Sequence, residues 1–363
     1  MRGRWAMAKI QRATLRRLGL PLIRPYRLSY RTFESFEPFL VEVEDDDGRS
    51  GFADGHISPG SSAETRDGGW AFLCESLQAA IGVETVAVKA SVLDRFATSK
   101  VAATAFATAI EVLEANPLLD LPDATILPLL TPLNALEPAA IAEEIEAWLA
   151  QGFGTFKVKV GKDVDADLKR VAVIQEATRG RATLRLDANR AYSREDGERF
   201  ASRLDPEGIE LFEQPCDADD WDANAAVAAV SRVPLMLDEP ICTLADIDRA
   251  ATITGVGYCK LKLKRFGGLD RLKQGLDAVR QNGMEPVLGD GLGSEIQGWL
   301  EACVARTTIR NAGEFNGFLK PRDRLFVEPM PFQDGAIRLP AGYRPRLDRD
   351  AVERFTLERR DFQ

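Results

Sequence analysis

The amino-acid sequence predicts an α/β protein built around a TIM-type barrel of alternating strands and helices. From about residue 127 onward, short apolar β-prone runs alternate with runs whose apolar residues have a helical period. Three of the predicted strands end in an acidic residue, Asp187, Glu213 and Asp238, and these are 26 and 25 residues apart, about one strand plus one helix. Lysine-rich runs, FKVKVG and CKLKLKRFGG, stand before and after them. Because sites in such barrels form at the carboxyl ends of the strands, these charges are predicted to meet.

Eight strands and their helices are expected in order along the barrel. The strands are ILPLLTPL (126–133), FKVKVG (156–161), ATLRLDAN (182–189), IELFEQP (209–215), PLMLDEP (234–240), YCKLKLK (258–264), EPVLGD (285–290) and EFNGFL (314–319). The clearest helical runs between them are AAIAEEIEAWLAQG (139–152), DADLKRVAVIQEAT (165–178), REDGERFASRLDP (194–206) and EIQGWLEACVART (295–307).

The N-terminal third has a different pattern. Residues 8–58 indicate an antiparallel unit, since apolar residues alternate on both sides of a D-D-D-G turn in FLVEVEDDDGRSGFADG. Residues 70–116 have helical periodicity. The predicted division is a first domain at 1–126, the barrel at 127–321, and a C-terminal segment at 322–363 that returns to the first domain.

Composition excludes several classes of function. A net charge of −9 and a pI near 5.0 argue against nucleic acid or an anionic membrane as the main partner. No apolar run approaches the roughly 18 residues that span a bilayer. The basic N-terminus, in which Met7 is an alternative start to Met1, lacks the apolar core of a secretion signal, and the five cysteines are scattered. A cytoplasmic protein with reduced thiols is expected, and its single histidine, His56, excludes sites that need two.

Strand geometry predicts which side chains share the barrel mouth. Residues two apart point the same way, so Lys157 and Lys159 face the mouth together, as do the alternating lysines of the sixth strand. In an eight-stranded ring the second and sixth strands are opposite, and the three acidic strand ends fill the arc between them. A set of carboxylates without His or Cys favours Mg²⁺ or Mn²⁺ over zinc.

Such a site suits removal of a proton α to a carboxylate, because the enediolate that forms needs strong electrostatic stabilisation. We expect Lys159 to act as one acid/base, with Lys157 lowering its pKa through its charge. Lys260, Lys262 and Lys264 are all candidates for the opposing group.

The ordered set of motifs resembles the enolase superfamily, specifically its muconate-lactonizing-enzyme subgroup. That resemblance implies a modified (β/α)7β barrel, with an α+β capping domain formed by the N-terminal region and the C-terminal tail. It implies metal ligation by Asp187, Glu213 and Asp238. The family's second lysine stands five residues before the first glycine of a GG pair, and counting back from Gly267 selects Lys262.

The resemblance also implies which residues touch the substrate. Glu314-Phe315-Asn316 stands where dipeptide epimerases carry D-x-D, and Asp290 lies in the loop after the seventh strand. The expected substrate contacts are Asp290, Glu314, Asn316, His56 and Tyr26, and Asn189 and Glu239 are expected beside the metal ligands.

The expected function is a Mg²⁺-dependent enzyme acting on a small carboxylate, in a homo-oligomer of the kind common among such barrels. The reaction expected first is racemisation, epimerisation or dehydration of a proline-like or N-substituted amino acid, because Asp290 and Glu314 suit a positively charged amino group. Muconate-type cycloisomerisation or an o-succinylbenzoate synthase-like reaction is the alternative. Muconate-type cycloisomerisation ranks lower because a dianionic substrate would meet those acids unfavourably. A non-catalytic ligand-binding barrel is the alternative from another class.

Overall fold

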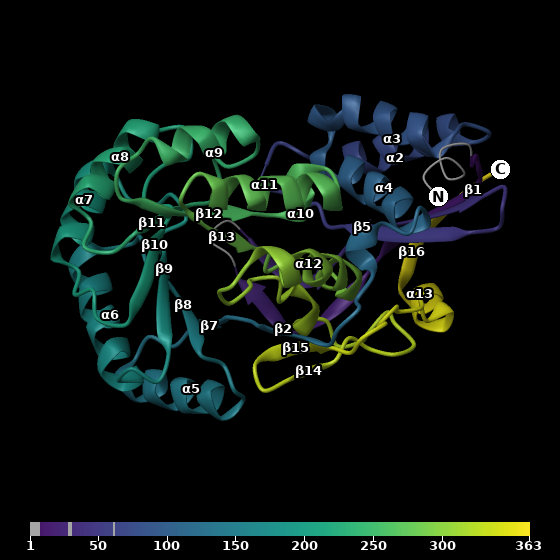
Figure 1. The fold of residues 1–363 in the computed structure, drawn as a ribbon. Coiled ribbons are helices and arrows are strands. Elements are labelled where there is room, and N and C mark those ends of the chain that lie inside the picture. The colour runs from purple at the N-terminus through teal and green to yellow at the C-terminus, as the bar shows by residue number, and fades with distance from the viewer. Residues whose placement is uncertain (1–7, 28–30, 61) are drawn as a thin grey trace.

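The computed structural model describes residues 8–27, 31–60 and 62–363. Met1 and Met7, the two alternative starts, lie outside the described residues. A seven-stranded parallel sheet with helices along its outer side forms one part, and an antiparallel sheet with its own helices forms the other (Figure 1). The prediction of a mixed α/β fold is confirmed.

The parallel sheet has the order β13-β12-β11-β10-β9-β8-β7, so each strand pairs with its neighbour along the chain. Its strands are β7 (Thr131–Leu133), β8 (Thr155–Lys159), β9 (Thr183–Asp187), β10 (Ile209–Glu213), β11 (Leu235–Leu237), β12 (Val256–Leu261) and β13 (Glu285–Leu288). Parallel strands whose two faces are both covered have apolar runs and few solvent-facing residues, as these do. The predicted parallel arrangement of these seven strands is confirmed.

Helices follow each strand of the parallel sheet, and all but the last of them lead to the next strand. They are α5 (Pro138–Ala150), α6 (Val164–Thr178), α7 (Arg194–Arg203), α8 (Trp221–Val230), α9 (Leu244–Ala251), α10 (Leu263–Phe266), α11 (Leu269–Gln281) and α12 (Glu295–Thr308). Several begin at a side chain that accepts a hydrogen bond from the first turn, as Asp163, Ser193 and Thr243 do for α6, α7 and α9. These caps fix where each loop ends, and therefore how far each strand end stands from its helix.

The predicted eighth strand is wrong. Gly317–Leu319 forms a short 3-10 helix (η3), and the described residues contain no strand that pairs β13 with β7, so the sheet is a parallel half-barrel. The segment before η3 is hydrogen-bonded on both sides: Glu314 N donates to Leu288 O, and Gly313 forms an isolated parallel bridge with Leu129. Those bonds hold Glu314 beside the site without a strand.

The predicted first strand also differs, because it divides into two. β6 (Thr125–Pro128) pairs antiparallel with β15 (Ala336–Leu339), which pairs with β14 (Phe332–Gln333). Only the second half of the apolar run, β7, joins the parallel sheet. The sixth strand ends at Leu261, earlier than predicted, and Lys264 therefore lies in α10.

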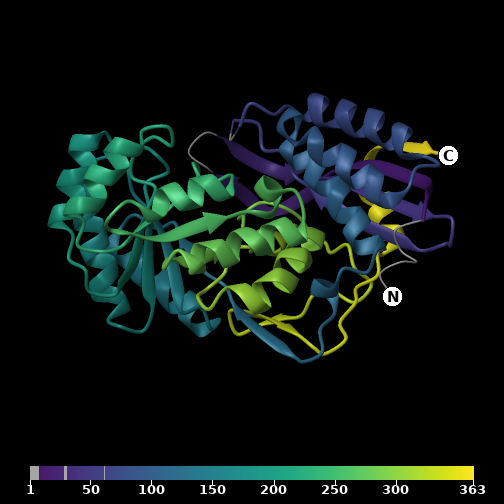
Figure 2. The same ribbon diagram turned by 45° about the horizontal axis from the view of Figure 1, so that its top comes forward.

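The N-terminal part is an antiparallel sheet of order β16-β1-β4-β5 covered by helices (Figure 2). Its strands are β1 (Ile10–Leu18), β4 (Phe39–Asp45), β5 (Ser50–Gly55) and the C-terminal β16 (Thr356–Phe362), with a two-stranded ribbon of β2 (Leu20–Arg27) and β3 (Thr32–Phe36) beside it. The helices are α2 (Arg66–Ala80), α3 (Thr85–Asp94), η1 (Phe96–Thr98), α4 (Lys100–Leu113), η2 (Pro117–Leu119) and α13 (Arg349–Phe355). The predicted hairpin at the D-D-D-G turn is confirmed by the pairing of β4 with β5.

The first and last of the described strands meet in that sheet, since β16 pairs antiparallel with β1. Where one domain ends and the next begins stays a prediction. α4 is buried along most of its length and contacts both β5 and α10, so it joins the capping part to the half-barrel.

All five cysteines are free. No helix in the described part of the chain is both long and apolar enough to cross a bilayer.

Candidate active site

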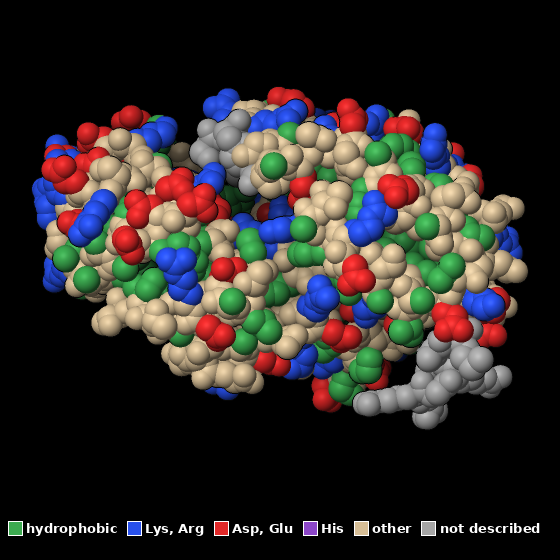
Figure 3. Space-filling view, turned by 90° about the horizontal axis from the view of Figure 1, so that it is seen from above, with side chains coloured by type: hydrophobic (Ala, Val, Ile, Leu, Met, Phe, Trp, Pro, Cys, Tyr) green, Lys and Arg blue, Asp and Glu red, His purple; other side chains and the backbone are tan. Residues whose placement is uncertain are grey.

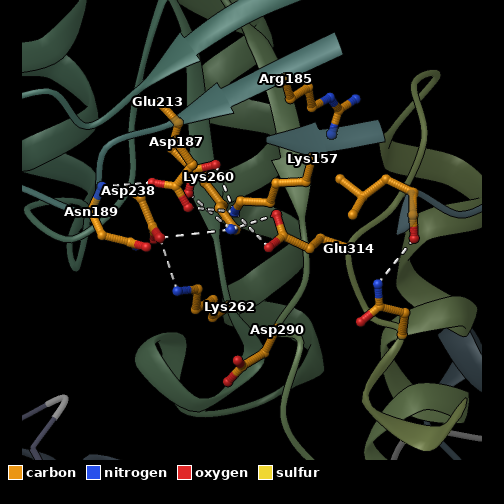
Figure 4. A network of polar contacts seen from close by, with 12 residues as sticks. Lys157, Arg185, Asp187, Asn189, Glu213, Asp238, Lys260, Lys262, Asp290 and Glu314 are labelled. Carbon is orange, nitrogen blue, oxygen red and sulfur yellow. Dashed lines mark hydrogen bonds and ion pairs between the residues drawn. The ribbon is translucent and has the colours of Figure 1, made fainter. Parts of the chain in front are cut away.

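The charged side chains predicted to meet do meet, at the carboxyl ends of β8 to β12 (Figure 4). Parallel register places Lys159 beside Asp187, and Asp187 beside Glu213. The carboxylates of Asp187, Glu213 and Asp238 are at most 2% exposed. Burying three acids so close together is costly unless cations neutralise them, and lysines from both flanks do so.

The deeper layer contains two ammonium groups, each among three carboxylates. Lys157 Nζ lies 2.8 Å from Asp187 Oδ2, 2.8 Å from Glu213 Oε2 and 2.7 Å from Glu314 Oε1. Lys260 Nζ lies 2.6 Å from Glu314 Oε2, 3.1 Å from Glu213 Oε1 and 3.7 Å from Asp238 Oδ2. Both lysines are buried, so these charges are fixed in the floor of the site.

The outer layer contains the two lysines predicted to transfer protons. Lys159 Nζ lies 2.5 Å from Asp187 Oδ2 and also donates to Asn189 Oδ1. Lys262 Nζ donates to Asp238 Oδ2 over 3.0 Å. The two lysines therefore stand on either side of Glu213, one held by the acid of β9 and the other by the acid that follows β11.

The pKa values reflect this crowding. Burial alone would raise the pKa of every carboxyl here, but neighbouring lysines hold the pKa values of Asp187 and Asp238 below their usual range. Burial and the charge of Asp187 raise the pKa of Glu213 to about 7. Burial lowers the pKa of Lys262, and the positive charge of Arg265 acts in the same direction.

The donor chemistry of the three strand-end acids suits a hard divalent cation. Among the described residues, no group of three His, Cys, Asp or Glu side chains has the arrangement of a metal site. The reason is visible in Figure 4, where lysine nitrogens lie between the carboxylates. One oxygen is incompletely satisfied: Glu213 Oε2 is buried without a hydrogen-bond donor, although Lys157 Nζ lies 2.8 Å away. An all-oxygen set with an unsatisfied buried oxygen fits Mg²⁺ or Mn²⁺ by type.

A cavity of about 370 Å³ opens above these residues. Figure 3 shows a hollow between the two parts of the molecule with Lys and Arg side chains in it. Lys159 and Lys262 line the cavity from the half-barrel, and Glu64 and Lys100 line it from the capping part. Glu64 accepts hydrogen bonds from the hydroxyl of Ser99, the residue before α4, and from Val101 N in its first turn, which fixes that helix end at the rim.

The acids predicted to bind substrate already have cationic partners. Glu314 is held by Lys157 and Lys260, and Asp290 pairs with Lys264. Because both acids are already neutralised, they neither favour a substrate amino group nor disfavour a dianion. Both residues do line the cavity.

Of the other residues predicted to contact substrate, Tyr26 lines the cavity and His56 does not. Tyr26 lines the cavity, and its ring lies under the ammonium of Lys320, 4.6 Å from the ring centroid. His56 does not line it: the imidazole is 1% exposed and packs between Phe33 and Phe36.

Asn316 is also directed away from the cavity. It donates to Leu130 O and accepts from Lys320 Nζ, so its amide serves the loop that carries Glu314. Neither Asn316 nor His56 is among the residues that line the cavity, because both side chains are used in packing behind its wall, and their contact with substrate stays a prediction.

The residues expected beside the acids are close by. Asn189 is in the left-handed region at φ 46° and donates its backbone N–H to Asp187 Oδ1. Glu239 lines the cavity 3.8 Å from Arg190, and its Oε2 atom is buried without a hydrogen bond.

Sequence reasoning missed Arg265 and Lys320. Arg265 donates to both the backbone and the carboxylate oxygen of Asp238. Lys320 donates to Gly291 O and Asn316 Oδ1, and burial lowers its pKa to about 7. The adjacent positive charges in KLKRFGG were a signal for Arg265. Lys320 directly follows the predicted eighth strand, and it contacts Tyr26 and Gly291, which line the cavity.

The GG pair after Lys262 has a specific partner. Gly268 has φ +143°, and a Cβ there would lie 2.9 Å from the carboxylate oxygens of Glu111. Glu111, on α4, accepts from Leu269 N over 2.6 Å and pairs with Lys89. The glycine therefore admits a carboxylate from the capping part, which ties the loop of Lys262 to α4.

Comparison with known proteins agrees with this geometry. A family model described as enolase C-terminal domain-like matches residues 140–345. An o-succinylbenzoate synthase from Geobacillus kaustophilus is 30% identical over 96% of this chain and 96% of its own length. Other relatives are named as racemases, epimerases and cycloisomerases.

Solved structures share the fold. A muconate lactonizing enzyme from Pseudomonas fluorescens, complexed with muconolactone, has a TM-score of 0.84 at 23% identity and covers 96% of this chain and 99% of that chain. A dipeptide epimerase from Cytophaga hutchinsonii, complexed with Mg and the dipeptide D-Ala-L-Val, has a TM-score of 0.88 at 22% identity, covering 98% and 100%.

Members of this superfamily use a divalent metal, and the relatives are isomerases, racemases or epimerases, and a lyase. This chain is an enzyme of these classes. The match to more than half of the chain, together with the full-length relative, shows that it belongs to the enolase superfamily, in the group of the muconate lactonizing enzymes.

Proposed function

We propose that this enzyme removes the α-proton of a small carboxylate substrate, with Lys159 and Lys262 as opposed acid/base groups. The observation that carries the proposal is that both ammonium groups reach one cavity from opposite flanks of the buried acids. A substrate α-carbon between them would meet one lysine on each face.

Asp187, Glu213 and Asp238 are the residues that would hold the divalent cation. When bound, Mg²⁺ would offset the negative charge that develops on the substrate carboxylate as the α-proton leaves. Support comes from the oxygen-only donor set and from the metal use of the superfamily.

Each proton has a defined destination in this arrangement. In racemisation, one lysine in its neutral form takes the α-proton, and the other, as an ammonium, returns a proton to the opposite face. In dehydration, the second lysine instead protonates a departing β-hydroxyl, which leaves as water. Lys157 stays in the floor, held by three carboxylates, and stabilises negative charge there.

Racemisation or epimerisation of an N-substituted or proline-like amino acid is the leading reaction. It needs both lysines as proton carriers, which the two-sided placement supports. The relatives named as racemases and epimerases favour the same chemistry.

Elimination by an o-succinylbenzoate synthase-like reaction is the second candidate. The observation that favours it is the 30% identity to such an enzyme over 96% of both chains. It requires only one proton abstraction, with the opposing lysine stabilising charge by its position.

Solvent-deuterium exchange followed by NMR and mass spectrometry tests the proposal. The Mg²⁺-loaded protein would be incubated in D₂O with free, N-acylated and proline-type amino acids, then with muconates and succinylbenzoate precursors. Lys159→Ala and Lys262→Ala are the test variants, and Lys169→Ala, an exposed lysine on α6, is the matched control.

For a racemase, each test variant should lose interconversion while retaining exchange into one enantiomer, and the control should behave as wild type. Loss of water would identify a dehydratase. Interconversion of the enantiomers that survives in both test variants would contradict the two-lysine proposal. Exchange that is absent with every substrate would also contradict it and would favour a barrel that only binds its ligand.

A further inference from the structure

The floor of the cavity contains a lysine that the proposed proton transfers do not use. Lys260 lies two residues before Lys262 on β12, so its side chain points into the same interior from one layer deeper. It is 2% exposed, and its three carboxylate neighbours prevent it from turning out toward the cavity mouth.

Its shortest contact is with Glu314, the acid on the cavity wall that would otherwise hold a cationic group. Lys260 Nζ lies 2.6 Å from Glu314 Oε2, and Lys157 Nζ donates to Glu314 Oε1 over 2.7 Å. The contact to Oε2 is an ion pair without hydrogen-bond geometry. Each oxygen of Glu314 therefore already has an ammonium beside it.

A second acid at the cavity wall is also neutralised by a lysine. Asp290 pairs with Lys264 of α10. Among the described residues, eight Lys or Arg and eight Asp or Glu side chains line the cavity. A divalent cation held by the strand-end acids would leave the wall with excess positive charge, even when Glu213 behind the wall is counted.

We infer that Lys260 sets the charge selectivity of this site. By holding Glu314 together with Lys157, it removes the carboxylate that could bind a substrate ammonium. The site then takes carboxylates whose α-substituent is uncharged, such as an N-acyl amide, and excludes free α-amino acids. Of the two substrate types in the proposed function, this narrows the choice to N-acylated amino acids over proline-like ones. A substrate ammonium placed beside Glu314 would meet the two buried ammonium groups of Lys157 and Lys260, which already neutralise both oxygens of that acid. This inference rests on the proposed α-proton abstraction.

Exchange measurements on matched substrate pairs test the inference. A panel of amino acids with differing side chains, each in its free, N-acetyl and N-succinyl forms, would be incubated in D₂O with the Mg²⁺-loaded enzyme. The rate of α-deuterium incorporation gives the ratio of N-acyl to free substrate. Wild type should favour the N-acyl form by at least tenfold.

Three variants separate selectivity from structure. Lys260→Met removes the charge but keeps the length of the side chain, and it should shift the ratio at least tenfold toward the free amino acid. Lys260→Arg keeps the charge and should retain the wild-type ratio. The double variant Lys260→Met/Glu314→Gln lacks the released carboxylate and should lose the shift. Thermal unfolding of each variant shows which ones are folded.

The outcomes distinguish this inference from the proposed function. If the wild-type enzyme exchanges free amino acids faster than their N-acyl forms, the inference about Lys260 is overturned, but the proposed function stands. This measurement uses only the wild-type enzyme, so it does not depend on the folding of any variant. An unchanged ratio in folded Lys260→Met would do the same. No exchange anywhere in the panel would overturn the proposed amino-acid chemistry, and this inference with it.

Discussion

Glu301 is expected to make the stability of this enzyme fall as the pH rises. This α12 carboxyl is 1% exposed, and its oxygens accept from Leu263 N over 3.3 Å and from Gln297 Nε2 over 3.4 Å. Burial, together with the charge of Asp290, raises its pKa from 4.5 to about 8. The folded protein therefore keeps a proton that the unfolded chain releases.

The sign and size follow from proton linkage. Between pH 4.5 and about 8, the folded state binds one more proton than the unfolded state, so the free energy of unfolding decreases by about 1.4 kcal/mol for each pH unit. The stabilisation is fully present below pH 4.5 and is lost as the pH rises through about 8. The whole interval corresponds to about 5 kcal/mol, and the part from pH 5.5 to 8 to about 3 kcal/mol.

Glu301→Gln should remove this dependence, because glutamine is neutral at every pH and has nearly the same shape. Urea unfolding at pH 5.5, 6.5, 7.5 and 8.5 would give the difference between wild type and variant. The variant should be within ~1 kcal/mol of wild type at pH 5.5 and gain ~2–3 kcal/mol on it by pH 8.5. Burial raises the pKa of Asp54 to about 7, but that group is present in both proteins and cancels in the difference.

Glu143→Gln, an exposed glutamate on α5, is the control and should show no such gain. A difference between wild type and Glu301→Gln that stays constant from pH 5.5 to 8.5 would refute the reasoning. It would mean that the Glu301 proton is not retained on folding.

Three further predictions concern the loop after Lys262, the half-barrel interior and the metal. Gly268→Ala should lower the free energy of unfolding by about 1–3 kcal/mol in urea, because φ is +143° and the new Cβ would approach Glu111. The control Gly154→Ala should be nearly neutral, because a Cβ at Gly154 would enter open space. Arg185→Met should cost about 3–5 kcal/mol by the same measurement, since it leaves a carboxylate without its buried guanidinium partner; a loss below 1 kcal/mol would contradict this. Removal of the metal by a chelator should abolish deuterium exchange, and added Mg²⁺ should restore it. Full exchange in the chelated enzyme would disprove the metal requirement. Asp238→Asn should weaken Mg²⁺ binding measured by calorimetry.

Much of the half-barrel could be predicted from local sequence. Strand periodicity and the interval between Asp187 and Glu213 determine which side chains reach the carboxyl ends of parallel strands, because alternation and parallel pairing are local rules. The eighth strand could not be predicted. Residues 314–319 have strand-like composition, but Glu314 N donates to the distant Leu288 O, whereas Leu319 N donates to Asn316 O within the short helix η3.

The site shows the same division. The sequence by itself determined that lysines and carboxylates would alternate around one mouth, and that no second histidine was available. Only the tertiary structure decided which charges pair. Glu314 reads as a free acid in the sequence, yet Lys157 and Lys260, from two different strands, neutralise it. Ion pairing depends on distances of a few ångströms between segments more than fifty residues apart, and periodicity along the chain does not contain those distances.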